Sequence, residues 1–125
     1  MINSRALADL KPDVAHVCQQ FKEQCAAAGT PVIITQTLRD AEYQDMLYAQ
    51  GRTTPGKIVT KARGGTSVHE KGEAWDFVPT ANGEPVWDDK SPLWEKCGAI
   101  AEGLGMEWGG RWKFIDKPHV QKRQK

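Results

Sequence analysis

Two histidines and an aspartate could together hold a catalytic metal ion. His69 and Asp76 are seven residues apart, and a second imidazole follows at His119. Two imidazoles and one carboxylate form a three-ligand set that leaves the fourth position of a tetrahedral zinc ion open for water, and this open position separates catalytic from structural zinc sites. Because zinc lowers the pKa of bound water toward about 7 and polarises a carbonyl group, the predicted chemistry is hydrolysis.

Such a site also needs a carboxylate that accepts the proton of the water and passes it to the leaving amine. Asp116 is the candidate, because it precedes His119 by three residues and an extended or turn segment can direct both side chains into one cleft. Asp88 and Asp89 lie in a predicted turn with no candidate ligand nearby. The residue types alone leave an alternative open, since an isolated histidine is more often a hydrogen-bonded structural residue than a ligand.

The element that carries Asp76 is predicted to be a strand over residues 73–78. Period-two alternation places Asp76 on one face of this strand and its neighbours Trp75 and Phe77 on the other. A second strand is predicted at residues 32–35, which are β-branched and follow a proline.

Amphipathic helices are predicted before and after the second of these strands. In residues 11–28 apolar side chains recur at steps of three and four, and a glycine follows. The next helix begins at Asp40, a capping residue, carries Met46 and Leu47 on one face, and ends at Gly51.

A third helix begins at Ser91-Pro92, where proline suits the first helical position. Its predicted buried stripe consists of Leu93, Cys97, Ile100 and Leu104. Short strands and turns are expected over residues 106–121. The mixture of elements contains too few β-α-β units for a wound parallel sheet, so the predicted class is α+β, a small antiparallel sheet packed with about three helices.

Residues 51–67 combine glycines and prolines with the basic side chains Arg52, Lys57, Lys61 and Arg63. This segment is too irregular for one regular element and is predicted to be a long surface loop. Loops of such length in compact domains tend to carry function, and this one leads directly to His69.

Length and composition indicate one domain spanning residues 1–125. A net charge of +1 provides no field that would attract nucleic acid or an anionic membrane. No apolar run is long enough for a membrane span, and the first residues lack a signal-peptide pattern, so we expect synthesis in the cytoplasm. Free buried thiols are expected at the three cysteines, Cys18, Cys25 and Cys97.

Several motifs in a fixed order resemble the M15 peptidases. The first is Ser67-x-His69-x-x-Gly72-x-Ala74-x-Asp76-Phe77, and the later ones are Trp108-Gly109-Gly110 and Asp116-x-Pro118-His119. The upstream pieces Thr37-Leu38-Arg39-Asp40 and Leu47 to Thr53 look like the branch of L-alanyl-D-glutamate endopeptidases found in phage endolysins and bacterial wall enzymes. The resemblance covers residues from about 32 to 121.

This resemblance implies a small α+β fold shared with D-Ala-D-Ala peptidases and the zinc-binding Hedgehog signalling domain. The positions of His69, Asp76 and His119 match the zinc ligands of the family, and Asp116 matches its catalytic acid/base. Arg39 matches an arginine that lines the site, and Ser67 a site-lining serine.

Less specific alternatives remain for several of these residues. Arg39 could pair with Glu42 instead, and Ser67 could only form a turn. Gln44 is expected to be a structural hydrogen-bonding residue.

Of the tryptophans, Trp75 and Trp94 are expected in the core, whereas Trp108 and Trp112 could line the cleft. Arg111 stands where many relatives carry an acidic residue, which bears on substrate preference.

The expected protein is thus a zinc peptidase that cuts peptidoglycan stem peptides, at the L-alanyl-D-glutamate bond, as a monomeric phage or prophage endolysin released from the cytoplasm to the wall. The loop lysines and arginine, Lys57, Lys61 and Arg63, are expected to aid contact with the anionic wall. The alternatives are a D-Ala-D-Ala carboxypeptidase or dipeptidase, which would use the same metal set, and a non-catalytic zinc-stabilised wall-binding module.

Overall fold

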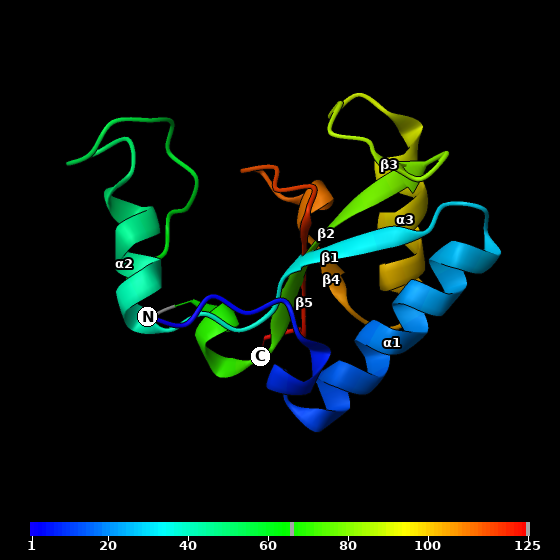
Figure 1. Ribbon diagram of the computed structural model, residues 1–125, viewed down its shortest axis with the longest axis horizontal. Helices are drawn as coiled ribbons and strands as arrows, with labels where there is room; N and C mark the ends of the chain where they lie inside the picture. The colour runs from blue at the N-terminus through cyan, green and yellow to red at the C-terminus, as the bar shows by residue number, and fades with distance from the viewer. Residues whose placement is uncertain (66, 125) are drawn as a thin grey trace.

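An antiparallel sheet organises the chain in the computed structural model, which describes residues 1–65 and 67–124 (Figure 1). The strands run in the order β1 (Val32–Gln36), β2 (Ala74–Ala81), β5 (His119–Gln121) and β4 (Glu107–Trp108), and β3 (Glu84–Pro85) pairs with β2. Together with the three α-helices of the described residues, this sheet confirms the predicted α+β class. Thr66 of the predicted loop and Lys125 of the predicted domain lie outside the described residues.

The central strand β2 pairs with β1 on one side and with β5 on the other. It extends beyond the predicted end at Val78 to Ala81 and turns into β3 through Asn82 and Gly83. Both turn residues have positive φ, 53° and 79°, as a two-residue hairpin of type I′ requires. Within β2, Trp75 is buried against the core while Asp76 faces away from it, as the alternation predicts.

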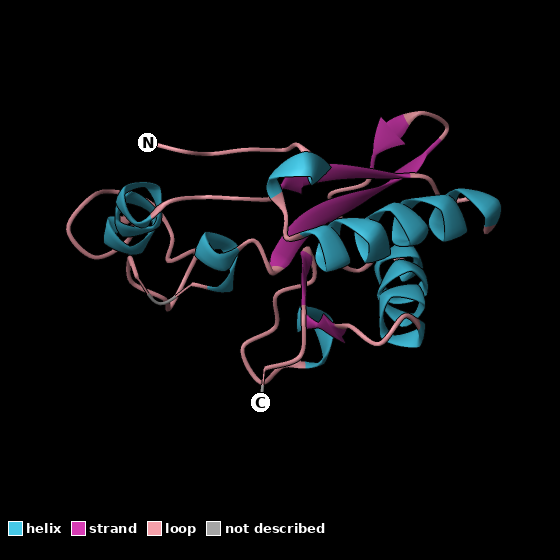
Figure 2. Cartoon of the chain, turned by 90° about the horizontal axis from the view of Figure 1, so that it is seen from below, coloured by secondary structure: helices cyan, strands magenta, loops and turns pink. Residues whose placement is uncertain are grey.

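Two helices, α1 (Pro12–Ala27) and α3 (Pro92–Gly103), cover the face of the sheet that carries Trp75 and Phe77 (Figure 2). The ring centroid of Phe21 on α1 lies 5.5 Å from that of Trp75 and 5.1 Å from that of Phe77. Burial of each such side chain contributes about 1.5–3 kcal/mol. The aromatic cluster therefore fixes β2 against the helices from behind the polar face.

The buried face of α3 is rotated from the predicted stripe. The residues that face the core are Trp94, Cys97, Gly98 and Ala101. The other members of the predicted stripe, Leu93, Ile100 and Leu104, are only half-buried. The cause is a close approach: a Cβ on Gly98 would lie 2.2 Å from the Trp108 ring, so the glycine marks the contact face that a count of apolar residues overlooks.

The short helix α2 (Ala41–Ala49) stands apart from this core, to the left in Figure 1. Asp40 caps it as predicted, accepting a hydrogen bond of 2.9 Å from the backbone of Tyr43. The predicted apolar face is wrong for Met46, which is 48% exposed, because little of the core reaches α2. Its buried residue is Gln44.

Gln44 attaches the following loop to α2. Its side-chain nitrogen donates to the carbonyl of Ala62 at 2.6 Å and to the hydroxyl of Thr60 at 3.2 Å. Arg52 adds a bond to the carbonyl of Thr60 at 3.1 Å. The expected structural role of Gln44 is confirmed, and the loop that it holds forms one wall of the site described below.

The three cysteines are free and buried, as expected. Burial raises the pKa of Cys18 to about 12, so this thiol stays protonated and packs as a small apolar side chain. Among the described residues, no helix combines the length and the apolar content that crossing a bilayer requires.

Candidate metal centre and active site

A cleft of about 570 Å³ opens on the face of β2 that carries Asp76. Its walls come from the end of β1, from α2 with the loop after it, and from the segment that joins β4 to β5. The predicted site residues all line this one cleft: Arg39, Ser67, His69, Asp76, Asp116 and His119. The fold thus brings together side chains that lie far apart in the sequence.

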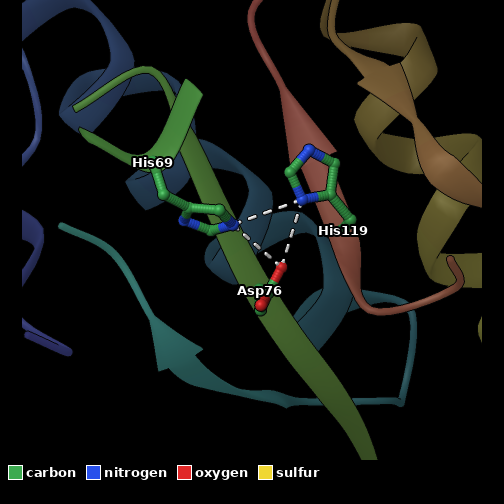
Figure 3. Close-up of side chains that lie close together, drawn as sticks. All are labelled: His69, Asp76 and His119. Atoms are coloured by element: carbon green, nitrogen blue, oxygen red, sulfur yellow. Dashed lines mark hydrogen bonds and ion pairs between the residues drawn. The ribbon is translucent and has the colours of Figure 1, made fainter. Parts of the chain in front are cut away.

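Three of these side chains form an equilateral triangle (Figure 3). His69 Nε2 lies 3.3 Å from His119 Nδ1, and each of these nitrogens lies 3.3 Å from Asp76 Oδ1. Ligands at about 2.0–2.1 Å from a tetrahedral zinc ion are separated by about 3.3–3.4 Å. The triangle therefore has the dimensions of one face of a zinc coordination tetrahedron.

The sheet and one short helix set the positions of the three groups. Asp76 on β2 is directly paired with His119 on β5 in the antiparallel register, so both side chains project from the same face of the sheet. His69 comes from the 3-10 helix η2 (Val68–Lys71), which begins at Ser67 and ends at Gly72 in the left-handed conformation. That glycine, with φ 69°, returns the chain to β2.

Each imidazole uses its outer nitrogen to donate an N–H hydrogen bond away from the triangle. His69 Nδ1 lies 2.9 Å from the carbonyl oxygen of Thr37, which can only accept, so Nδ1 carries the proton and Nε2 offers a lone pair. His119 Nε2 lies 2.7 Å from Gln121 Oε1, which leaves Nδ1 as the lone-pair atom. Outer hydrogen bonds of this kind orient metal-binding histidines.

These contacts leave three electron-pair donors facing one another, which fits a bound cation. Asp76 Oδ1 is buried and has no hydrogen-bond donor. Burial alone would raise the pKa of Asp76, but the imidazoles of His69 and His119, when protonated, outweigh it and hold that pKa well below its usual range. A buried carboxylate oxygen between two outward-donating imidazoles is stabilised by positive charge at the centre, and two nitrogens with one oxygen suit zinc.

Thr37 and Gln121 were not predicted as partners of the histidines. The contact of His69 with a backbone carbonyl has no signature in residue type. The contact of Gln121 could have been predicted, because Gln121 follows His119 by two residues in a strand and therefore lies on the same face of it.

Asp116 reaches the cleft through a tight turn. Its carbonyl accepts the backbone N–H of His119 at 3.1 Å, and its own N–H donates to Gly109 at 2.9 Å. A Cβ on Gly109 would lie 2.3 Å from the Asp116 carbonyl oxygen, so glycine is required there. Burial and the negative charge of Asp76 raise the pKa of Asp116, which suits a group that must both accept and release a proton.

Arg39 extends from the segment after β1 into the cleft. Its buried Nε has no hydrogen-bond partner in the described structure. Burial lowers the pKa of Arg39, while the carboxylates of Asp76 and Asp116 oppose that shift, and the guanidinium remains charged. Glu42, the alternative partner, lies 3.8 Å from the N-terminal ammonium group instead. The guanidinium therefore keeps a donor for a ligand.

The side chain of Ser67 lines the cleft but is used as a helix cap. Its hydroxyl accepts the backbone N–H of His69 at 3.2 Å, while the Glu70 carboxylate accepts the backbone N–H of Ser67 at 3.0 Å. This reciprocal pair is a capping box. The geometry favours the turn-forming alternative, in which Ser67 positions the histidine.

The two tryptophans beside the paired glycines have different positions. Trp112 lines the cleft, with its ring centroid 5.1 Å from that of His119. Trp108 is 3% exposed and belongs to the core, because α3 presents Gly98 to its ring. Trp75 and Trp94 are buried, as expected.

Basic residues of the loop differ in their access to the cleft. Lys61 lines it and places its ammonium group 4.4 Å from the centre of the Phe114 ring on the opposite wall. The other two, Lys57 and Arg63, do not line it. Arg111 is directed to α3, where it forms ion pairs with Glu95 and Glu102, and it too is absent from the cleft lining. Its effect on substrate preference would therefore have to be indirect.

Replacing Gln121 by leucine is expected to weaken zinc binding about 10–100-fold, because His119 loses the acceptor that orients its ring. Competition with a chromogenic chelator measures the affinity. Gln19→Leu, on the exposed face of α1, is the matched control. Unchanged zinc affinity in Gln121→Leu would show that this hydrogen bond has no influence on the ligand.

Three comparisons relate the chain to known proteins. The sequence profile of a family described as D-alanyl-D-alanine carboxypeptidase matches residues 60–122. The peptidoglycan L-alanyl-D-glutamate endopeptidase CwlK of Bacillus subtilis (strain 168) is 43% identical to this chain, and the match covers 91% of this chain and 74% of CwlK.

Two solved structures share the fold. The L-Ala D-Glu endopeptidase ChiX of Serratia marcescens superposes with a TM-score of 0.68 at 22% identity, covering 98% of this chain and 89% of ChiX. The vancomycin-resistance D,D-pentapeptidase VanY, solved in complex with Zn(II), gives a TM-score of 0.67 at 13% identity, covering 98% of this chain and 78% of VanY. At these identities the likeness concerns the fold.

Proposed function

Since this chain belongs to the M15 peptidase family, we propose that it cuts the stem peptides of peptidoglycan at the bond between L-alanine and D-glutamate, with a zinc ion held by His69, Asp76 and His119. The observation that carries this proposal is the triangle of ligand atoms, each pair 3.3 Å apart, with both imidazoles donating outward. The choice of bond is supported by the 43% identity to CwlK.

The side chains around the triangle have different roles in hydrolysis. Bound zinc would supply Lewis acidity, which activates water and polarises the scissile carbonyl. Asp116 accepts the proton of the attacking water at its carboxylate and delivers it to the nitrogen of the leaving amine. The Arg39 guanidinium donates hydrogen bonds to a substrate carboxylate or to the carbonyl oxygen as negative charge develops on it. Ser67 holds η2 so that His69 keeps its position.

The charge of the cleft also supports an acidic substrate residue. Arg39 and Lys61 both line it, and their cations would attract the carboxylate of D-glutamate. The competing reaction, removal of a terminal D-alanine, uses the same metal chemistry and is the activity after which the matching family profile is described.

Digestion of purified peptidoglycan separates the two reactions. We expect new amino-terminal glutamate and no free D-alanine, measured by amino-terminal labelling and by amino-acid analysis of the soluble products. Release of free D-alanine without new glutamate ends would replace the endopeptidase by a carboxypeptidase. Zinc-loaded protein that binds the wall but releases neither product would instead favour the non-catalytic binding module.

The proposed enzyme acts as a monomeric single domain. An endolysin role, in which the protein reaches the wall from the cytoplasm, remains a prediction from the sequence resemblance. Lysis of growing cells only when the protein is produced together with an agent that opens the inner membrane would support this role. Wall contact by Lys57, Lys61 and Arg63 also remains a prediction.

A further inference from the structure

A second hollow, of about 400 Å³, lies beside the metal-site cleft. Asp116 and Pro118 line both spaces, so the segment that carries the proposed acid/base lies between them. A substrate whose scissile bond lies at Asp116 would reach this hollow by passing over the segment that carries Asp116.

The segment that joins β4 to β5 separates the two spaces. Trp112 and Phe114 line the cleft, whereas Ile115 and Lys117 line the second hollow. Asp116, between the members of the second pair, lines both. One wall thus presents different side chains to two neighbouring parts of a substrate.

Hydrogen bonds hold the opposite wall, the loop of residues 86–91 between β3 and α3. The Lys117 ammonium group donates to the carbonyl of Asp89. The indole nitrogen of Trp94 donates to the carbonyl of Asp88 at 2.9 Å. The loop is therefore fixed both to the dividing segment and to α3, and the hollow is built into the fold.

The surface of this hollow combines exposed apolar side chains with carboxylates. Trp87 and Ile115 both line the hollow and are each 61% exposed, so together they give it an apolar surface. Asp89 and Asp116 supply hydrogen-bond acceptors, while the charge of Lys117 is already directed to a carbonyl. Such a surface disfavours an anionic ligand and suits a neutral ring with an apolar face and a rim of hydroxyl and amide donors.

The proposed substrate has such a ring at the matching place. In peptidoglycan the amino group of L-alanine is joined by an amide to the lactyl group of N-acetylmuramic acid, so the alanine residue and the lactyl group separate the scissile carbonyl from the sugar. Two such units span at most about 7 Å, so a sugar in the space next to Asp116 is within reach of the scissile bond. The cationic side of the cleft, with Arg39 and Lys61, would take the acidic residue on the other side of the bond.

We propose that the hollow lined by Trp87, Ile115 and Asp89 binds the N-acetylmuramyl group of the substrate, with the sugar ring packed on the indole of Trp87. This subsite rests on the proposed function, because it assumes cleavage at L-alanine. It makes the enzyme selective for stem peptides that are still attached to glycan.

Two substrates test the subsite: the stem tripeptide with an acetylated amino terminus, and the same peptide joined to N-acetylmuramic acid. For Trp87→Ala we expect kcat/KM to fall about tenfold or more with the muramyl peptide and to change less than about twofold with the acetyl peptide. Trp87→Phe, which keeps an aromatic face, should recover most of the loss. Ile33→Ala, an exposed apolar residue on β1, is the matched control.

Binding of N-acetylmuramyl-L-alanine, measured by calorimetry, separates this proposal from the proposed reaction. If the parent cleaves neither substrate but binds this fragment, and Trp87→Ala does not, the reaction is wrong and the sugar site stands. Equal losses on both substrates, no loss on either, or no binding by the parent would overturn the sugar site.

Discussion

His69→Ala is expected to lose its zinc and nearly all peptidase activity. The substitution removes one corner of the 3.3 Å triangle and leaves Asp76 and His119 as a two-ligand site. Charge stabilisation by a bound metal is worth several kcal/mol, so the rate should fall by roughly a thousandfold or more. Elemental analysis gives the zinc content, and release of new amino-terminal glutamate from peptidoglycan gives the rate.

His16→Ala is the matched control, because His16 is exposed on α1 far from the cleft in sequence and is absent from its lining. Far-ultraviolet circular dichroism of both variants checks that the helices are retained. A His69→Ala protein that keeps one zinc per chain and full activity would exclude this metal centre. Activity in a parent protein that contains no metal would exclude metal-dependent hydrolysis altogether.

Asp116→Asn should separate metal binding from catalysis. The amide has nearly the same shape, and the backbone hydrogen bonds of residue 116 to Gly109 and His119 are retained, so zinc content should match the parent. An amide cannot accept the proton of the attacking water, and loss of a general base costs about 10²–10⁴-fold in kcat. Zinc analysis and steady-state kinetics on a soluble stem peptide measure the two effects.

The pH profile provides a second readout for this variant. In the parent, kcat/KM should decline as pH falls through the pKa of Asp116, because the protonated carboxyl group no longer accepts a proton. That acidic limb should disappear in Asp116→Asn. Asp13→Asn, an exposed carboxylate paired with Lys122, serves as the control. Unchanged kcat together with unchanged zinc content would remove Asp116 from the mechanism.

Local patterns predicted the parts of the fold that depend on neighbouring residues. The alternation around Asp76 and the cap at Asp40 follow from strand geometry and from hydrogen bonding within one turn. The buried face of α3 could not be predicted in this way, because it depends on the packing of Trp108, a residue of another element, against Gly98. The exposure of Met46 could not be predicted locally either, because it depends on the position of α2 away from the core.

The candidate ligands could be proposed from residue types and family resemblance, but their arrangement could not. The direct pairing of Asp76 with His119 is a long-range register between β2 and β5. The orientation of the His69 ring depends on the backbone carbonyl of Thr37, and a backbone contact of this kind cannot be predicted from residue types. The candidate residues of the site could thus be named from the sequence, whereas the distances between them depend on the tertiary structure.

The pairing of β5 with β2 also bears on when the proposed metal site can form during synthesis. His69 and Asp76 are synthesised first, whereas His119 follows His69 by fifty residues and belongs to the last strand of the sheet. A ribosome-bound chain that ends before β5 holds two of the three proposed ligands and lacks the strand that would bring the third to them. With these three ligands as proposed, metal-dependent cleavage would have to await translation through β5.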